Sequence, residues 1–133
     1  MDPARRLAGF GCGLCFGEDA EAAKAYRLRT ERDLIDESHF GVSLRRCSAC
    51  GQRFVHIFTE FVDWADGDDP QYTDLLPVTD EEAARLASQG ESVDLCAIEA
   101  MGAARRRLVM TFPKGGPRKV YWTVGGLGIR PGG

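Results

Sequence analysis

The chain has 133 residues, of which 44% are hydrophobic and 28% are charged, and its formal net charge is −3. This length is usual for one domain and the hydrophobic share excludes a disordered chain, so we expect a single domain over residues 1–133. The negative net charge disfavours a general nucleic-acid binder, and no apolar run approaches the roughly 20 residues that span a bilayer.

The N-terminal segment has two arginines but only a short apolar stretch, which Cys12 and several glycines interrupt. This pattern is not that of a secretory signal, so we expect a cytoplasmic protein. In a reducing compartment, the five cysteines favour metal binding over disulfide bonds.

The first half of the chain predicts a turn, a short helix and two strands. Residues 9–17 are rich in glycine and predict a tight turn, whereas residues 18–29 have the composition of a short helix or the start of a strand. Residues 40–45 alternate between apolar and polar side chains, and residues 54–62 are rich in β-branched and aromatic side chains. Both patterns are typical of strands, which would form a hairpin with residues 47–51 at its tip.

The next part of the chain predicts an acidic loop followed by two helices. Residues 63–78 combine acidic side chains with glycine and proline, which indicates the loop. Thr79 begins a capping box and predicts a helix that ends at Gly90. Ser92 is the expected cap of a second helix, which ends in the basic run at residues 105–107.

The last part predicts a hairpin with strands at residues 108–112 and 119–124, joined by glycine and proline. The fold class is therefore α+β, with an antiparallel sheet and two or three short helices. Its expected parts are a cysteine-containing unit at residues 9–62, the acidic loop at 63–78, a helical segment and hairpin at 79–124, and a loose tail at 125–133.

Four of the five cysteines form two Cys-x-x-Cys pairs, Cys12 with Cys15 and Cys47 with Cys50. Zinc prefers four ligands at the corners of a tetrahedron and binds thiolates well. A Cys-x-x-Cys turn directs two sulfurs at one ion, so two such turns complete the shell and leave no position for water. We therefore predict one structural zinc ion bound by these four residues.

Residues 47–51, Cys-Ser-Ala-Cys-Gly, resemble the rubredoxin-like knuckles of the zinc-ribbon group, which have the pattern Cys-x-x-Cys-Gly. The first pair differs, because glycine comes one position later, and the 31 residues between the pairs exceed the roughly 15 to 20 of most ribbons. The resemblance covers residues 9–62 and implies a metal and a local fold, but no reaction. Gly13, Gly17 and Gly51 allow the positive φ angles that such turns use.

Two other chemistries fit parts of the cysteine pattern. A single pair also occurs in thioredoxin-like redox proteins, but neither pair here has the strand-to-helix context of a βαβ unit. Iron also accepts four thiolates, which would make the chain a rubredoxin-like electron carrier. We expect His39 and His56 to be structural rather than ligands, and Cys96 to be a small buried residue on the apolar side of a helix.

The acidic segment is a candidate surface for a protein partner. Residues 54–84 contain nine acidic residues and neither lysine nor arginine, without the ligand spacing of a calcium-binding loop. Aromatic side chains among charges are common at protein interfaces, and an acidic surface suits a basic partner. The expected contact residues are Trp64, Asp66, Asp68, Asp69 and Tyr72.

The C-terminal segment has the opposite charge, with seven basic residues and no acidic one from residue 100 onward. It supports a second hypothesis, nucleic-acid binding, unless these residues pair with the acidic segment of the same chain. The residues concerned are Arg105, Arg106, Arg107, Lys114, Arg118 and Lys119. Because no nucleophile–base pair is recognisable, we expect a non-enzymatic interaction or regulatory module first, a nucleic-acid binder second and an iron redox protein third.

Overall fold

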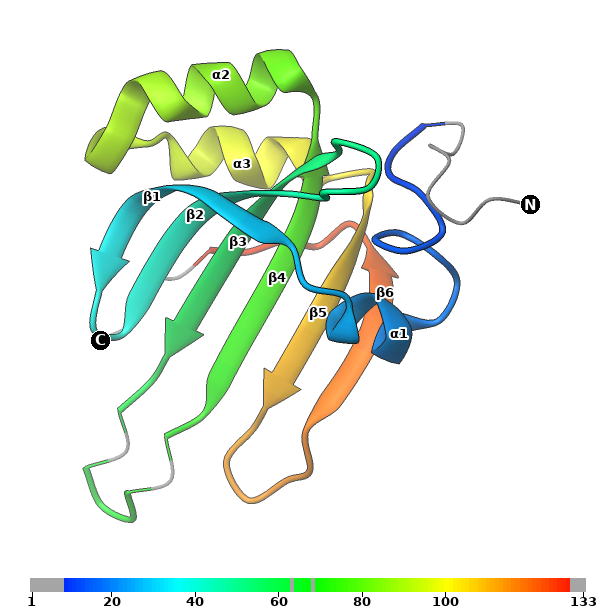
Figure 1. Ribbon diagram of the computed structural model, residues 1–133. Coiled ribbons are helices and arrows are strands. Elements are labelled where there is room, and N and C mark those ends of the chain that lie inside the picture. Colours follow the sequence, from blue (N-terminus) through cyan, green and yellow to red (C-terminus); the bar gives the residue numbers. More distant parts are fainter. Residues whose placement is uncertain (1–8, 63, 68, 130–133) are drawn as a thin grey trace.

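The computed structural model describes residues 9–62, 64–67 and 69–129. In this part of the chain, a six-stranded antiparallel sheet is combined with three α-helices (Figure 1). The strands lie in the sheet in the order in which they occur along the chain, so each strand pairs with the next one. This is an α+β architecture, as the sequence predicts.

The strands are β1 (Arg29–Glu37), β2 (Phe40–Arg46), β3 (Arg53–Glu60), β4 (Gln71–Val78), β5 (Arg106–Phe112) and β6 (Lys119–Val124). The helices are α1 (Ala20–Ala25), α2 (Asp80–Gln89), a short 3-10 helix η1 (Gly90–Ser92) and α3 (Leu95–Met101).

The β2–β3 hairpin forms as its alternating pattern predicts. Its register runs without a shift from Phe40 opposite Thr59 to Arg46 opposite Arg53. The turn between the strands contains the second cysteine pair, so the tip of the hairpin carries two of the expected metal ligands.

Strand β1 is irregular, which explains why its sequence pattern is weak. Its pairing with β2 shifts between Asp33 and Ile35, so the intervening Leu34 is an extra residue in the ladder. As a result, the adjacent side chains of Leu34 and Ile35 both contact the same apolar cluster. A strand of this kind lacks the two-residue alternation by which strands are recognised in a sequence.

Helix α2 has the predicted capping box and ends at Gly90, whereas three other expectations about the helices are wrong. Asp94, not Ser92, caps α3, and residues 105–107 do not end that helix because Arg106 already begins β5. Helix α1 ends at Ala25 and β1 begins at Arg29, so residues 18–29 contain both of the elements that their sequence allows. Cys96 is exposed, because α3 buries its opposite side through Ile98.

The expectation of a loop at residues 63–78 is wrong in its second half. Residues 71–78 form β4, which pairs with β3 along its whole length and with β5 over residues 71–75. Its apolar end, Leu75 to Val78, is buried. Tertiary pairing on both sides therefore outweighs the local signals of proline and acidic side chains.

Neighbouring residues of β3 and β4 point to opposite faces of the sheet, and each face carries an apolar cluster. Helices α2 and α3 lie over one face, whereas α1 lies beside β5 and β6 (Figure 1). We call the apolar cluster under α2 and α3 the helix-side core; it contains Val55, Ile57 and Leu76. The cluster on the other face, the cysteine-side core, contains Phe54 and Leu75 together with the cysteines.

The C-terminal segment is not a loose tail as far as the structure describes it. Leu127 is buried in the helix-side core, and a Cβ atom at Gly102 would lie 2.7 Å from Leu127 Cδ2. The backbone N–H of Ile129 donates to Glu99 at 2.9 Å. Residues 125–129 therefore pack against α3, and residues 130–133 lie outside the described part. None of the described helices has the length and apolar character of a membrane span.

Candidate metal centre

The two cysteine pairs form two similar turns. The first precedes α1, and the second joins β2 to β3. The N–H of Phe16 donates to Cys12 O at 2.8 Å, and the N–H of Gly51 donates to Cys47 O at the same distance. In each turn, the carbonyl oxygen of the first cysteine therefore accepts a backbone hydrogen bond that closes the turn.

Glycine makes both turns possible, but not at all of the predicted positions. Gly51 has φ of 83°, as expected for the residue that follows the second pair. In the first turn the residue with positive φ is Gly11, at 71°, whereas Gly13 and Gly17 have no positive φ. Gly17 is needed for space instead, because a Cβ atom there would lie 2.5 Å from Gly13 O.

The four sulfur atoms lie close together at the interface of the two turns. Cys12 Sγ is 3.8 Å from Cys15 Sγ and 3.9 Å from Cys47 Sγ, and Cys15 Sγ is 3.8 Å from Cys50 Sγ. All four lie within 4.8 Å of one another. A tetrahedral ion with Zn–S bonds of about 2.3 Å requires sulfurs about 3.8 Å apart. The observed separations fit that geometry and exceed the roughly 2.05 Å of a disulfide bond.

The surroundings of the sulfurs suit thiolate ligands. Cys12 and Cys47 are fully buried, Cys15 is 5% exposed, and only Cys50 is half-buried. Backbone N–H groups face the sulfurs, since Cys12 N lies 3.4 Å from Cys15 Sγ and Gln52 N lies 3.4 Å from Cys50 Sγ. Hydrogen bonds of this kind stabilise the charged form of a thiol, the form that binds metal.

The thiols of Cys15, Cys47 and Cys50 differ in their pKa values. Burial raises the pKa of Cys15, and it raises the pKa of Cys50 to about 11. Burial acts in the same direction on Cys47, but the Tyr26 hydroxyl, 3.4 Å from its sulfur, and nearby backbone groups lower the pKa of Cys47 to about 7. The same contact raises the pKa of Tyr26 to about 12. Of these three thiols, Cys47 is therefore the one that most readily gives up its proton when a metal ion binds.

Gln52 connects the two turns, although the sequence gives no sign of this role. Its side chain is completely buried and accepts a hydrogen bond from the N–H of Gly11 at 2.9 Å. Its amide group donates to Arg53 O and to Val78 O, both at 2.8 Å. One side chain therefore fixes the first turn against the ends of β3 and β4.

The first turn is also held by the C-terminal hairpin. The Arg106 guanidinium lies against two aromatic rings, 4.2 Å from the centroid of Phe16 and 4.0 Å from that of Trp122. It donates to the backbone oxygens of Phe16 and Gly17, and the indole N–H of Trp122 donates to Glu18 O at 3.1 Å. The sequence places Arg106 in a basic cluster, whereas the structure gives it a structural contact beside the cysteines.

Three of the six residues of the basic cluster form ion pairs with the acidic segment of the same chain, which is the alternative to nucleic-acid binding. Arg105 makes two hydrogen bonds to Glu82, at 2.7 and 2.9 Å. Arg107 is buried and lies 2.9 Å from Asp74, and Lys114 lies 2.8 Å from Asp66. Of the six residues, Lys114, Arg118 and Lys119 are exposed on the β5–β6 turn and β6.

The residues of the acidic surface are not all brought together. Trp64 is 90% exposed in the β3–β4 loop, and Asp66 is also exposed there. Tyr72 belongs to β4, where its ring packs against Phe61 with the centroids 5.8 Å apart. Asp69 is half-buried, and Asp68 lies outside the described residues.

The two histidines do not reach the cysteine cluster. His39 Nδ1 lies 2.9 Å from Glu60 Oε1, at the opposite end of β2 and β3 from the cysteines. His56 lies on β3, where burial and the charge of Arg45 lower its pKa to about 4. Neither residue belongs to the group of possible metal ligands found among the described residues.

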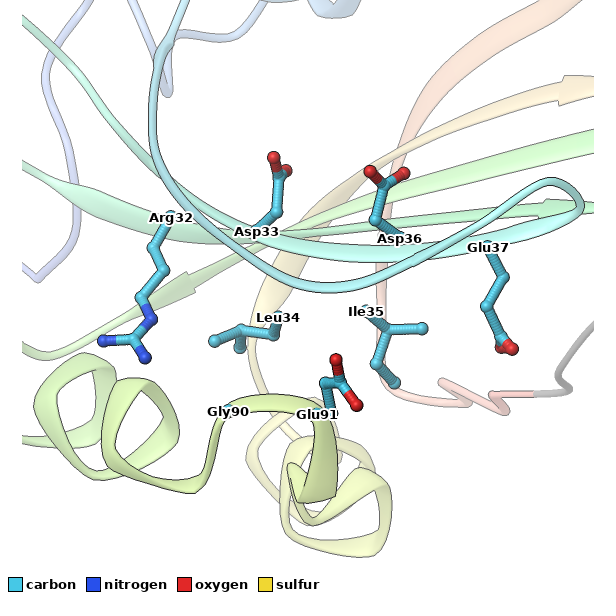
Figure 2. A pocket seen from close by; sticks show the side chains of 8 residues that line it. All are labelled: Arg32, Asp33, Leu34, Ile35, Asp36, Glu37, Gly90 and Glu91. Carbon is cyan, nitrogen blue, oxygen red and sulfur yellow. The ribbon is translucent and has the colours of Figure 1, made fainter.

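A cavity of about 560 Å³ lies between β1 and η1, and no cysteine lines it (Figure 2). Leu34 and Ile35 point from β1 toward Glu91 of η1, whereas the carboxylates of Asp33 and Asp36 point to the other side of the strand (Figure 2). The carboxylates of Asp33 and Asp36 therefore point away from η1, whereas that of Glu37 lies on the same side of the strand as Ile35 (Figure 2).

Comparison with known proteins gives no match: no protein-family model, no curated protein and no solved structure matches this chain. The chemistry of the site therefore follows from its own residues. Four cysteines from two separate turns lie in an arrangement that can hold a metal ion.

Proposed function

We propose that Cys12, Cys15, Cys47 and Cys50 bind one structural zinc ion, and that the domain is a non-enzymatic module that binds another protein. The observation that carries the metal assignment is the spacing of the four sulfurs, all within 4.8 Å of one another. A shell of four cysteines is typical of structural zinc, because it offers no open position for a substrate or water.

The contacts that hold the two cysteine turns agree with a structural role for the metal ion. Gln52 and Arg106 hold the turns by contacts to backbone oxygens and N–H groups, which fix the positions of the cysteines before a metal binds. The bound ion then joins the N-terminal turn to the β2–β3 hairpin. In this way metal binding contributes directly to the free energy of folding.

The proposed partner surface is the β3–β4 loop around Trp64. An indole that is 90% exposed gains free energy when a partner covers it, and tryptophan is enriched among the residues that dominate interfaces. The carboxylates of Asp66 and Asp69 lie in the same loop. We therefore expect a partner with a basic surface, although Lys114 already compensates part of the charge of Asp66.

The metal assignment is tested by measuring zinc and iron per chain in protein purified without chelators. We expect about one zinc and no iron in the unaltered protein, and loss of zinc in Cys12→Ser and Cys47→Ser. Cys96→Ser is the matched control, because Cys96 is exposed on α3 and lies outside the cluster. We expect it to keep its zinc.

Cobalt titration of the chelated, unaltered protein tests the ligand set without depending on whether the variants fold. Four thiolates around cobalt produce the visible absorption bands of a tetrahedral site, with saturation at one equivalent. Zinc that survives in both Cys12→Ser and Cys47→Ser would contradict the shared site. One iron per chain with its own visible absorption would instead support the rubredoxin-like alternative.

A further inference from the structure

A second cavity, of about 390 Å³, lies on the cysteine side of the sheet, under the connection from α1 to β1. We call it the α1–β1 pocket. Leu75 and Met110 form part of its apolar wall, and Lys24, Arg27, Arg45 and His56 supply its basic groups. A cavity of this size with an apolar wall and a few polar groups has the features of a small-molecule site.

The charges of the α1–β1 pocket all have one sign. Three cationic side chains line it, and no aspartate or glutamate does. None of the three forms an ion pair within 4.0 Å with a described residue, in contrast to Arg105 and Arg107. A positive field that converges on a cavity attracts anions.

Arg45 has fewer partners than a half-buried guanidinium needs. Its described hydrogen bond runs from Nε to Ser43 Oγ at 3.3 Å, and Asp33 attracts it only from beyond ion-pair distance. Burial of a charge without a paired opposite charge costs free energy. An anion bound in the pocket would remove that cost and would use the guanidinium's remaining N–H donors.

His56 lies beside Arg45 on the same face of the sheet. It is paired with Ser43 in the register of β2 and β3, two residues along from Arg45, so the two side chains are diagonal neighbours. Its ring is neutral at pH 7, since burial and the charge of Arg45 lower its pKa to about 4. Neither ring nitrogen has a hydrogen-bond partner among the described residues, so one N–H is available to a ligand.

We propose that the α1–β1 pocket binds a small phosphate monoester, whose phosphate contacts Arg45, His56 and Lys24 while its organic group lies against Leu75 and Met110. Arginine matches phosphate oxygens with two parallel donors, and three cations suit a dianion better than a single carboxylate. The apolar wall gives an organic phosphate an advantage over inorganic phosphate.

The pocket adjoins the metal centre without sharing its ligands. Tyr26 lines the pocket, and its hydroxyl lies 3.4 Å from Cys47 Sγ. The phosphate contacts proposed here come from other residues. The proposal therefore does not depend on which metal the cysteines bind, and the two proposals can fail separately.

The proposal is tested by NMR titration of the metal-containing, ¹⁵N-labelled protein at pH 7 and constant ionic strength. The probes are inorganic phosphate, adenosine monophosphate and adenosine. We expect saturable shifts at Arg45, His56 and the α1–β1 connection with adenosine monophosphate, weaker binding of phosphate, and no binding of adenosine. Shifts that do not saturate, or that spread over the whole basic surface, would overturn the proposal.

Variants assign the binding to the pocket. Arg45→Gln should weaken binding of adenosine monophosphate at least tenfold, whereas Arg32→Gln, which changes an exposed arginine outside the pocket, should leave it within twofold. The zinc content and the NMR spectrum of each variant report whether it is folded. If Arg45→Gln does not fold, the double variant Lys24→Gln/Arg27→Gln provides the same test. Unchanged affinity in the folded variant would refute the site.

Discussion

Gln52 and Arg106, which are not metal-ligand candidates, hold the two cysteine turns in place. Gln52 was missed because a single glutamine after Cys-x-x-Cys-Gly looks like an ordinary polar turn residue, and only the fold brings it to Gly11 and Val78. For Arg106 the sequence predicts a place in a basic surface, because three arginines in succession suggest solvent exposure. The local sequence cannot show that Phe16, 90 residues earlier, lies beneath it.

The four metal-ligand candidates, in contrast, could be predicted from the sequence. The chemistry of a Cys-x-x-Cys pair is local, so the spacing alone indicates which sulfurs can face one ion. Cys96 has no such partner in the sequence. The prediction that Cys96 is buried is wrong, because its burial depends on which side of α3 contacts the sheet.

His56 should make stability depend on pH in a defined window. Its pKa is about 4 in the folded protein and 6.5 when unfolded, so between these values the unfolded chain binds a proton that the folded protein does not. Stability therefore falls as the pH is lowered. We expect His56 to account for roughly 2 to 3 kcal/mol between pH 7 and pH 4.5.

Urea denaturation of the unaltered protein and of His56→Gln across this range measures that contribution. Both proteins carry the same thiols and carboxylates, so the contributions of these groups cancel in the difference. No carboxylate lines the pocket around His56 to offset the effect of Arg45. If the free energies of unfolding of the two proteins change with pH in parallel, the pH dependence is not due to His56.

At the scale of elements, hairpins with regular alternation were predictable, and strands defined by their neighbours were not. The β2–β3 hairpin, the β5–β6 hairpin and the capping box of α2 all follow from local patterns. Strand β4 contains Pro77 and Asp74, and it becomes a strand because β3 and β5 pair with it on both sides. A short stretch of sequence does not show which distant strands it will pair with.

The β3–β4 loop is the element on which the proposed partner surface depends. We expect Trp64→Ala to abolish affinity capture of a specific partner from cell extract, because the indole supplies exposed apolar area. Tyr121→Ala is the matched control, since Tyr121 is an aromatic residue on β6 that is 42% exposed. A partner that both variants retain, or that both lose, would place the interface elsewhere.

At the scale of the whole molecule, the two faces of the sheet differ in what stabilises them. The cysteine-side core is built around the four cysteines, whereas the helix-side core contains none of them. We therefore expect metal removal to loosen one face more than the other. Hydrogen exchange after chelation should show at least a tenfold larger loss of protection in α1, β5 and β6 than in α2 and β2.

Equal loss of protection throughout the chain would mean that the two cores unfold as one unit. Unchanged protection would mean that the metal does not support the fold. The comparison uses the complete protein before and after chelation, so each amide is its own reference.

The contacts of Arg106 and Trp122 also bear on how the protein is made. Arg106 and Trp122 follow the first cysteine turn by about 90 positions or more, so during synthesis this turn leaves the ribosome long before these two supports. The four thiols of the nascent chain must remain reduced and unmodified until the last hairpin has emerged. A stalled or truncated chain that ends before β5 would present an unsupported cysteine turn, which gives cellular quality control a chemical feature by which to recognise an incomplete product.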